Sequence, residues 1–433
     1  MMEFRPIARR VLEERYLRRD PDGKVVETPE ELFHRVARGV AAAEARYGGT
    51  EAVARQTRDF FEAMASLKFL PNSPTLMNAD LPNGQLAACF VIPVPDDMAG
   101  IMEAVKAMAL IHQTGGGTGF SFTRLRPKGD QVRSTGRVAS GPLGFMRIFD
   151  TTTEVVKQGG RRRGANMGIL RVDHPDILEF IKAKADGGIL TNFNLSVAVT
   201  DEFMRKVEQG EDYPLINPRT GQEWGRLNAR EVFDTICRYA LETGDPGIIF
   251  LDAIERANPT PELGRLEVTN PCGEQPLLPY ESCNLGSINL ARLVKNGDLD
   301  WDELDRLVRL GVTFLDDCID QSHFPLAQIT AITRANRKIG LGVMGLADMF
   351  IQLGLAYDSP EALELAERLM ARIQAQAVAQ SEALARMRGP FPNFYISRYH
   401  QEGRPPRRNA TVTTVAPTGT QRNGCLGCWL PVG

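Results

Sequence analysis

The stretch Asn270-Pro271-Cys272-Gly273-Glu274-Gln275-Pro276 carries an amide, a thiol and a carboxylate at alternate positions, and a second cysteine, Cys283, follows it closely. In extended backbone, alternate side chains project to one face. Asn270, Cys272 and Glu274 are therefore predicted to lie on a common face. The prolines and the glycine favour a shaped loop over a helix at this point.

The pairing of Cys272 with Glu274 limits the chemistry of the thiol. A nearby carboxylate opposes thiolate formation, and no histidine lies close by in the sequence. Cysteine-protease chemistry is therefore disfavoured. Two interpretations stay open: a neutral thiol that takes part in hydrogen-atom transfer with the carboxylate as base, or a buried loop cysteine with a capping asparagine.

Two glycine-rich runs lie on the N-terminal side of this stretch. Residues 113–121, Gln-Thr-Gly-Gly-Gly-Thr-Gly-Phe-Ser, have neither dinucleotide nor Walker spacing, so they indicate close backbone approach to a ligand or a tight turn. Residues 158–166, Gln-Gly-Gly-Arg-Arg-Arg-Gly-Ala-Asn, suit phosphate or base recognition, although a solvated cationic turn is also compatible.

The remaining motifs are weaker. Residues 416–420, Ala-Pro-Thr-Gly-Thr, follow a strand-like run at 411–415 and offer amides and hydroxyls to a phosphate. Cys425 and Cys428 form a lone Cys-x-x-Cys without a second ligand pair. Cys237 and Cys318 lie in helical apolar patterns and are predicted to pack in the core. The five histidines lack metal-ligand spacing, so no metal site is predicted.

Composition places the chain among ordinary globular proteins. Its 433 residues are 43% apolar and 24% charged, with a net charge of −3 and seven cysteines. No apolar run approaches membrane-spanning length, and the N-terminus lacks the apolar core of a signal peptide. We therefore expect a cytoplasmic protein with mostly reduced thiols and with no affinity for nucleic acid or membrane.

Local patterns predict an α/β architecture that follows a helical opening of about seventy residues. Thr28, Pro29 and Glu31 form a capping-box pattern. Further helices are expected over residues 176–184, 229–243 and 301–322, and from 359 to about 389. Strands are expected over residues 120–126, 167–172, 195–199, 248–251 and 411–415, and their alternation with helices is typical of α/β folds.

Taken together, the motifs resemble the large catalytic chain of ribonucleotide reductase, most closely its adenosylcobalamin-dependent class II. The resemblance runs from about Phe69 to Thr420. Its further markers are Asn-Ser-Pro-Thr-Leu-Met-Asn at 72–78, Leu-Ala-Ala-Cys-Phe at 86–90, Glu-Ser-Cys-Asn-Leu-Gly-Ser-Ile-Asn-Leu at 281–290 and Ile-Gly-Leu-Gly-Val-Met-Gly-Leu-Ala-Asp at 339–348.

The resemblance implies a ten-stranded α/β barrel with a central finger loop, and a reaction that converts ribonucleotides to deoxyribonucleotides. It implies that Cys272 is the thiyl-radical residue, that Glu274 is the base at the 3′-hydroxyl and that Asn270 holds the ribose hydroxyls. Cys89 and Cys283 would be the reductant pair. Their sequence separation makes this pairing dependent on the fold.

The resemblance also implies two nucleotide sites. Asp96 would bind the effector ribose at a dimer interface. The loop from Lys157 to Asn166, with Gln158 and Arg162 as its main contacts, would pass effector identity to the substrate base. The positions that match the family's substrate site are Ser73, Ala88, Cys89, Gly117, Asn270, Pro271, Cys272, Gly273, Glu274, Pro417, Thr418, Gly419 and Thr420.

Two features favour the cobalamin class: the spacing of eleven positions between Cys272 and Cys283, and the lack of an N-terminal nucleotide-binding cone. The expected partners are a ribonucleoside diphosphate, a nucleoside triphosphate effector, a thioredoxin-like dithiol and a second copy of the chain. Alternatives are a large subunit of the metal-cofactor class I and an inactive nucleotide-binding chain.

The resemblance stops abruptly after Thr420, where the family pattern normally continues. We therefore expect a truncation or frameshift near this codon, and accidental cysteines at 425 and 428. The expected organisation is a helical region over residues 1–70, an incomplete catalytic barrel over 71–420 and an aberrant tail over 421–433.

Overall fold

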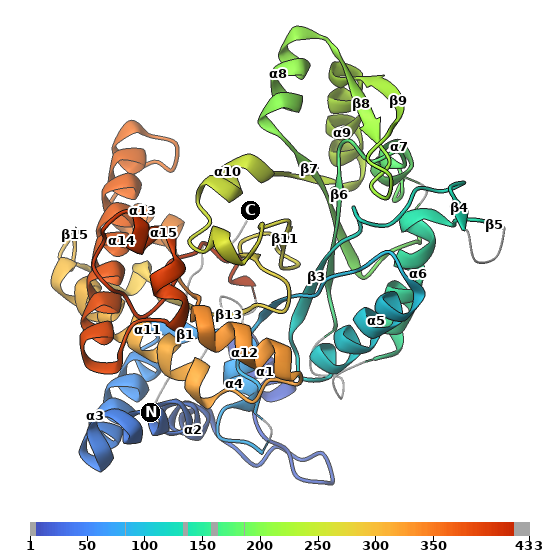
Figure 1. Cartoon of the computed structure of the whole chain (residues 1–433). Coiled ribbons are helices and arrows are strands. Elements are labelled where there is room, and N and C mark those ends of the chain that lie inside the picture. The colour runs from blue at the N-terminus through green and yellow to red at the C-terminus, as the bar shows by residue number, and fades with distance from the viewer. Residues whose placement is uncertain (1–5, 83, 133–136, 157–162, 186, 420–433) are drawn as a thin grey trace. The chain divides into compact units, whose positions relative to one another are not determined.

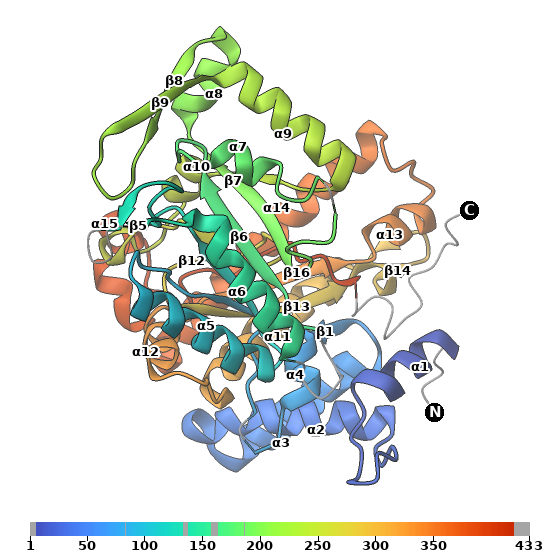
Figure 2. The same ribbon diagram turned by 90° about the vertical axis from the view of Figure 1, so that its right-hand side faces the viewer.

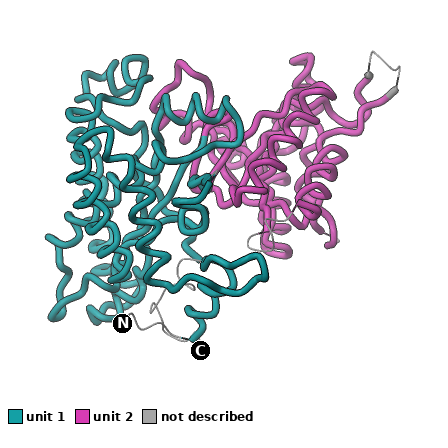
Figure 3. The backbone as a smooth tube through the Cα atoms, turned by 90° about the horizontal axis from the view of Figure 1, so that it is seen from below, with its two compact units in different colours: residues 1–88, 282–433 teal, residues 89–281 magenta. Residues whose placement is uncertain are grey.

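The computed structural model describes residues 6–82, 84–132, 137–156, 163–185 and 187–419. The chain divides into two compact units, residues 1–88 with 282–433 and residues 89–281, which Figure 3 colours separately. Within the described ranges, no helix has both the length and the apolar character that crossing a membrane requires.

The first unit opens with three helices, which confirms the predicted helical start. They are α1 (Pro6–Arg15), α2 (Pro29–Ala41) and α3 (Ala45–Ala65). At the start of α2 the Thr28 hydroxyl accepts from the Glu31 amide at 3.2 Å, and the Glu31 carboxylate accepts from the Thr28 amide at 2.7 Å. This is the predicted capping box, and it satisfies backbone donors that a helix start otherwise leaves unpaired.

The sheet of the first unit contains β1 (Phe69–Pro71), β13 (Ser282–Asn289) and β16 (Ile339–Met344). β1 pairs antiparallel with β13, and β13 pairs parallel with β16. The helix α11 (Trp301–Gln321) is buried along most of its length and packs on β13, on β16 and on α14 (Pro360–Arg388). Both helices were predicted from sequence. Their apolar faces supply much of the core of this unit.

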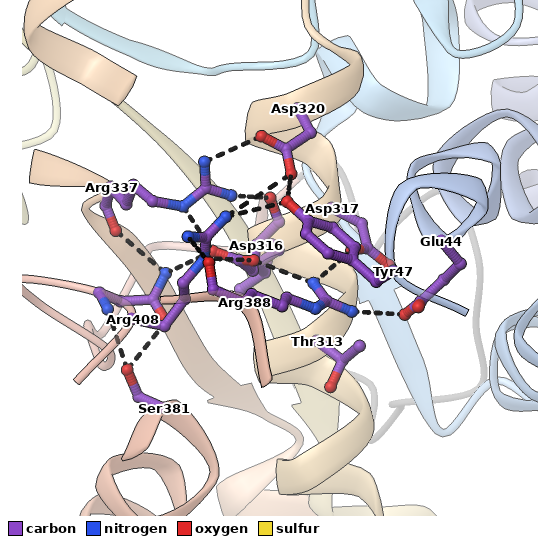
Figure 4. Close-up of polar contacts among 12 residues, drawn as sticks. Glu44, Tyr47, Thr313, Asp316, Asp317, Asp320, Arg337, Ser381, Arg388 and Arg408 are labelled. Carbon is purple, nitrogen blue, oxygen red and sulfur yellow. Dashed lines mark hydrogen bonds and ion pairs between the residues drawn. The ribbon is translucent and has the colours of Figure 1, made fainter. Parts of the chain in front are cut away.

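A buried ionic cluster joins segments of the first unit that lie far apart in the sequence (Figure 4). Asp316 of α11 accepts from Arg337 at 2.8 Å, Arg388 at 3.0 Å and Arg408 at 3.2 Å. Burial favours the neutral acid, but the three arginines outweigh it and lower the pKa of Asp316 to about 2. The other acidic and phenolic members are Glu44, Tyr47, Asp317 and Asp320.

The second unit is built on a parallel sheet. Its strands, in spatial order, are β2 (Cys89–Val91), β3 (Gly117–Ser121), β6 (Asn166–Arg171), β7 (Phe193–Val199) and β10 (Gly247–Phe250). Parallel strands need crossover connections, and helices supply them here. The crossover helices α5 (Met98–Gln113) and α6 (Gly141–Val155) lie side by side against the sheet (Figures 1 and 2). The α/β class predicted from the alternating pattern is confirmed.

The outer part of the second unit carries α8 (Asp201–Gln209), the hairpin of β8 (Asp212–Ile216) and β9 (Glu223–Asn228), and α9 (Ala229–Thr243). α9 has the predicted bounds, but the prediction that Cys237 packs in the core is wrong because this cysteine is exposed. Its neighbour Ile236 takes the buried position, and one helical step turns the next side chain outward. Cys318 is buried, as predicted.

Three other local predictions differ from the structure. The strand expected over 120–126 is β3, which begins at Gly117 and ends at Ser121. The helix expected over 176–184 is α7 (Ile177–Ile181), which is shorter at both ends. The strand expected over 411–415 is reduced to one bridge between Thr413 and Leu341.

The other elements are short. In the first unit they are α4 (Ser73–Asn78), β14 (Val294–Lys295), β15 (Asp298–Leu299), α12 (Ala327–Asn336), α13 (Leu346–Gln352) and α15 (Arg398–Gln401). In the second unit they are β4 (Gln131–Val132), β5 (Arg137–Val138), α10 (Leu251–Arg256), β11 (Val268–Thr269) and β12 (Pro276–Leu277).

Candidate active site

The stretch 270–276 forms a tight loop between two short strands. β11 pairs antiparallel with β12, and Thr269 lies opposite Pro276. The loop closes on Asn270, whose amide donates to the Gln275 carbonyl at 3.2 Å and whose carbonyl accepts from the Gly273 amide at 3.0 Å. Gly273 has φ +86°, a conformation that glycine adopts without strain. The predicted loop is therefore present, although its backbone turns where an extended run was expected.

This turn brings two of the three expected side chains together. The Asn270 side-chain amide donates to the Glu274 carboxylate at 2.7 Å. Cys272 is exposed and does not join the other two side chains. The alternation expected for extended backbone therefore does not describe its position. The chain therefore presents a thiol at the surface of the loop and an amide–carboxylate pair at its base.

Cys89 joins the amide–carboxylate pair from another element. It is the first residue of β2 and is buried. Its Sγ accepts from the Asn270 Nδ2 at 3.1 Å and donates to the Glu274 Oε1 at 3.9 Å. Cys89, Asn270 and Glu274 thus form one contact set within residues 89–281, which we call the thiol–carboxylate set.

The glycine run allows β3 to lie directly against this loop. A Cβ at Gly117 would lie 2.8 Å from Cγ of Pro271, and a Cβ at Gly119 would overlap the carbonyl oxygen of Thr269. Gly115 begins the run with φ +91° just after α5. The turn expected from the sequence is therefore present, and the close approach that the glycines permit is to the chain's own loop.

Asn194 holds the same loop, and no sequence pattern predicted this role. Its Nδ2 on β7 donates to the carbonyl of Pro271 at 2.7 Å. β7 contains a second polar residue, Ser196, and no motif surrounds Asn194, so its contact with the loop could not be found from the sequence.

Cys283, Ser73 and Ala88 belong to the other compact unit. Cys283 is buried in β13, and its carbonyl accepts from the amide of Ala88, the residue before Cys89, at 3.1 Å. Ser73 begins α4, and its hydroxyl is 2.8 Å from the Tyr16 hydroxyl. Pro417, Thr418 and Gly419 follow the bridge at Thr413, and Thr420 lies outside the described residues.

Asp96 is held by Arg126. The guanidinium Nε donates to the two carboxylate oxygens at 3.1 and 2.9 Å, and the Arg126 amide also donates at 3.1 Å. A carboxylate has about four lone-pair positions, so capacity for a ribose hydroxyl remains. Lys157, Gln158 and Arg162 lie outside the described residues.

Two family models match this chain. A family model described as "Ribonucleotide reductase, barrel domain" matches residues 87–408, and one described as "Ribonucleotide reductase, all-alpha domain" matches residues 2–84. The chain belongs to the ribonucleotide reductase family. The predicted family and its α/β barrel fold are thereby confirmed, with an all-α region at the N-terminal side.

Several curated ribonucleotide reductases are similar over most of the chain. Proteins named vitamin B12-dependent ribonucleoside-diphosphate reductase from Mycobacterium tuberculosis and Thermoplasma acidophilum are 53% and 49% identical, each over 95% of this chain. A ribonucleoside-diphosphate reductase subunit alpha from Synechocystis is 30% identical over 87% of the chain. This chain spans 59%, 61% and 57% of these relatives' lengths.

Proposed function

We propose that this chain reduces ribonucleoside diphosphates to 2′-deoxyribonucleotides by a thiyl-radical reaction, for DNA synthesis and repair. The observation that carries the proposal is the thiol–carboxylate set beside the Cys272 loop. The Glu274 carboxylate contacts the buried thiol of Cys89 and lies two residues from the exposed thiol of Cys272. One base is thus associated with two thiols. The names of the similar proteins support the same reaction.

Cys272 would begin and end the reaction. Its thiyl radical takes the 3′-hydrogen atom of the ribose, while the Glu274 carboxylate takes the 3′-hydroxyl proton and Asn270 holds the ribose hydroxyls. The 2′-hydroxyl then leaves as water. Cys272 finally returns a hydrogen atom to the 3′-carbon, so its thiyl radical is regenerated.

Cys89 and Cys283 would supply the two electrons. Their two thiols become one disulfide as the C2′–O bond is replaced by a C2′–H bond, so that atoms and electrons balance. The contact of the Cys89 thiol with Glu274 supports a proton route from sulfur to the departing oxygen. A thioredoxin-like dithiol would reduce the disulfide after each turnover.

The exposed thiol of Cys272 fits an external radical source. A group bound outside the loop can reach a side chain that is exposed, whereas the buried Cys89 and Cys283 are shielded. Adenosylcobalamin, when bound, would supply the radical that removes the hydrogen atom from Cys272. The similar proteins named vitamin B12-dependent favour this source over a metal-containing partner subunit.

We further propose a substrate site and an effector site. The proposed substrate-site residues are those that the family resemblance implies. Two of them, Gly117 and Pro271, lie directly against each other. Asp96 and residues 157–166 would bind a nucleoside triphosphate effector and pass its identity to the substrate site, in a homodimer. The carboxylate of Asp96 is already oriented by Arg126, which supports a role in recognising hydroxyl groups.

The experiment is a Cys272→Ser variant of this chain with adenosylcobalamin, a dithiol and a ribonucleoside diphosphate. We expect the unaltered chain to form deoxynucleotide, and we expect the variant to lose this activity while effector affinity stays nearly unchanged. Serine keeps the shape of the side chain, but its O–H bond is too strong for reversible hydrogen-atom exchange. Cys237→Ser, at an exposed cysteine on α9, is the matched control.

Two results would contradict the proposal. Substantial turnover by Cys272→Ser would remove Cys272 from its role. A lack of deoxynucleotide from the unaltered chain, with the cofactor and dithiol present, would contradict the proposed activity of this chain.

A further inference from the structure

A series of buried hydrogen bonds connects the glycine run on β3 with α5, β6 and α6 of the second unit. The Thr118 hydroxyl on β3 donates to the Asn166 Oδ1 on β6 at 2.8 Å and lies 2.9 Å from the His112 Nε2 at the end of α5. Because the hydroxyl has one proton, its contact with His112 requires an N–H at Nε2. The Asn166 Nδ2 then donates to the Thr153 hydroxyl on α6 at 2.9 Å.

The opposite edge of the His112 ring faces residues that follow the arginine-rich run. A Cβ at Gly164 would lie 2.6 Å from the His112 Nδ1, so the Gly164 backbone lies directly against the ring. The next residue, Ala165, accepts from the Thr118 amide at 3.1 Å. His112 therefore lies between the backbone at 163–166 and strand β3, and it is 2% exposed.

Strand β3 continues this path to the loop of Cys272. Gly117 and Gly119, on either side of Thr118, are the two positions where the loop at 269–271 lies against the strand. Interiors are close-packed, so a displaced ring at this point must move its neighbours. A shift of Gly164 would thus reach Pro271 through His112 and β3.

We propose that His112 is a positioning residue that couples the backbone at 163–166 to the glycine run and thereby to the loop carrying Cys272. The functional consequence, control of substrate preference by the segment 157–166, rests on the proposed function. The mechanical coupling itself does not depend on turnover. Only described residues of this segment, Arg163 to Asn166, enter the coupling.

The test is a double-mutant cycle read by amide hydrogen exchange of the whole chain. Gly164→Ala pushes against the imidazole and is expected to raise exchange about tenfold at residues 117–119 and 270–275. The amides of Asn270, Gly273 and Gln275 are suitable monitors because each is hydrogen-bonded within the loop. Gly225→Ala is the matched control, because nothing lies within 4 Å of its Cβ position.

The second half of the cycle removes the ring. In a His112→Ala background, Gly164→Ala is expected to add less than about a twofold change, because the added methyl group then has no imidazole to displace. An equal increment in both backgrounds would overturn the proposal. If His112→Ala loses its near-ultraviolet circular dichroism, His112→Asn, which shortens the side chain and keeps an N–H donor, replaces it.

A functional measurement separates this inference from the proposed activity. Gly164→Ala is expected to change the ratio of ribonucleoside diphosphates reduced with a given effector, and Gly225→Ala is expected to leave it unchanged. Coupled exchange without any turnover would refute the proposed function alone. Cys272-dependent turnover without coupled exchange would refute the role of His112 alone.

Discussion

The Asn270 side chain makes three hydrogen bonds inside the protein. Its two amide protons go to Cys89 and Glu274, and its Oδ1 accepts from the Gln275 amide at 3.0 Å. One side chain therefore fixes the turn, the carboxylate and the buried thiol together. The sequence predicted Asn270 as a ribose ligand, and its role in orienting the carboxylate is additional.

Glu274→Gln tests the proposed base. Glutamine keeps the shape of the side chain and an oxygen that can accept from Asn270, so the fold should persist with an unchanged midpoint of thermal unfolding. Because the amide cannot take a proton, we expect turnover to fall by about 100-fold or more. Steady-state kinetics of deoxynucleotide formation provide the measurement.

The matched control is Glu267→Gln, at a partly exposed carboxylate that pairs with Arg124 at 3.1 Å. This variant should retain its activity. Near-normal turnover by Glu274→Gln would exclude Glu274 as the base.

A buried carboxylate links the turn of the β8–β9 hairpin to the segment before β4. Asp130, just before β4, accepts from Arg219 at 2.9 and 3.0 Å and from Asn217 at 3.1 Å, both in the hairpin turn. Arg219 is the main cause of the lowered pKa of Asp130, which falls from 3.8 to about 2. A carboxylate with a lowered pKa stabilises the folded state while it is ionised.

Asp130→Asn is therefore expected to lower the free energy of unfolding at neutral pH by about 2 kcal/mol. The wild-type advantage is full above about pH 4 and disappears as the pH falls through about 2. Urea unfolding of both proteins across this pH range measures the difference. An advantage that persists unchanged at pH 2 would contradict the assignment, and Asp234→Asn, at an exposed aspartate on α9, should show no such trend.

Helices were predicted correctly where the residues that cap both ends are present in the sequence. α14 begins after Ser359, whose hydroxyl accepts from the Ala362 amide, and ends at Gly389 with φ +81°. Caps of this kind act within a few residues, so a sequence is sufficient to locate them. The segment 411–415 has strand-like residues, but its pairing depends on a partner strand: backbone hydrogen bonds join Thr411, Val412 and Thr414 to β16, and Thr413 forms an isolated bridge with Leu341.

Asp316 is the centre of an ionic cluster that connects separate segments of the first unit, from Glu44 to Arg408. This fully buried carboxylate accepts from three arginines that come from different parts of the chain. Asp317, beside it, has a pKa raised by burial well above its usual value, although Arg388 donates to it at 2.7 Å. The same arginines also contact two further carboxylates: Arg337 pairs with Asp320 at 2.9 Å and Arg388 pairs with Glu44 at 2.5 Å.

Asp316→Asn would leave buried guanidinium groups without their shared carboxylate. We expect a loss of about 3–5 kcal/mol in the free energy of unfolding, because a broken buried ion pair leaves uncompensated charge. Chemical denaturation measures it. Glu13→Gln, in the exposed pair of Glu13 with Arg9, is the control and should cost less than about 1 kcal/mol; equal losses in the two variants would contradict the importance of the cluster.

The linear order of residues was sufficient for the family motifs, the helix caps and the apolar periodicities, because these depend on neighbours a few positions apart. It did not reveal that Cys89 meets Asn270 across a separation of 181 residues, or that the glycines at 117 and 119 accommodate the chain's own loop. Nor did it indicate the path from Gly164 through His112 to β3. Such contacts depend on which strands become neighbours and how closely their backbones pack, and only the folded chain establishes both.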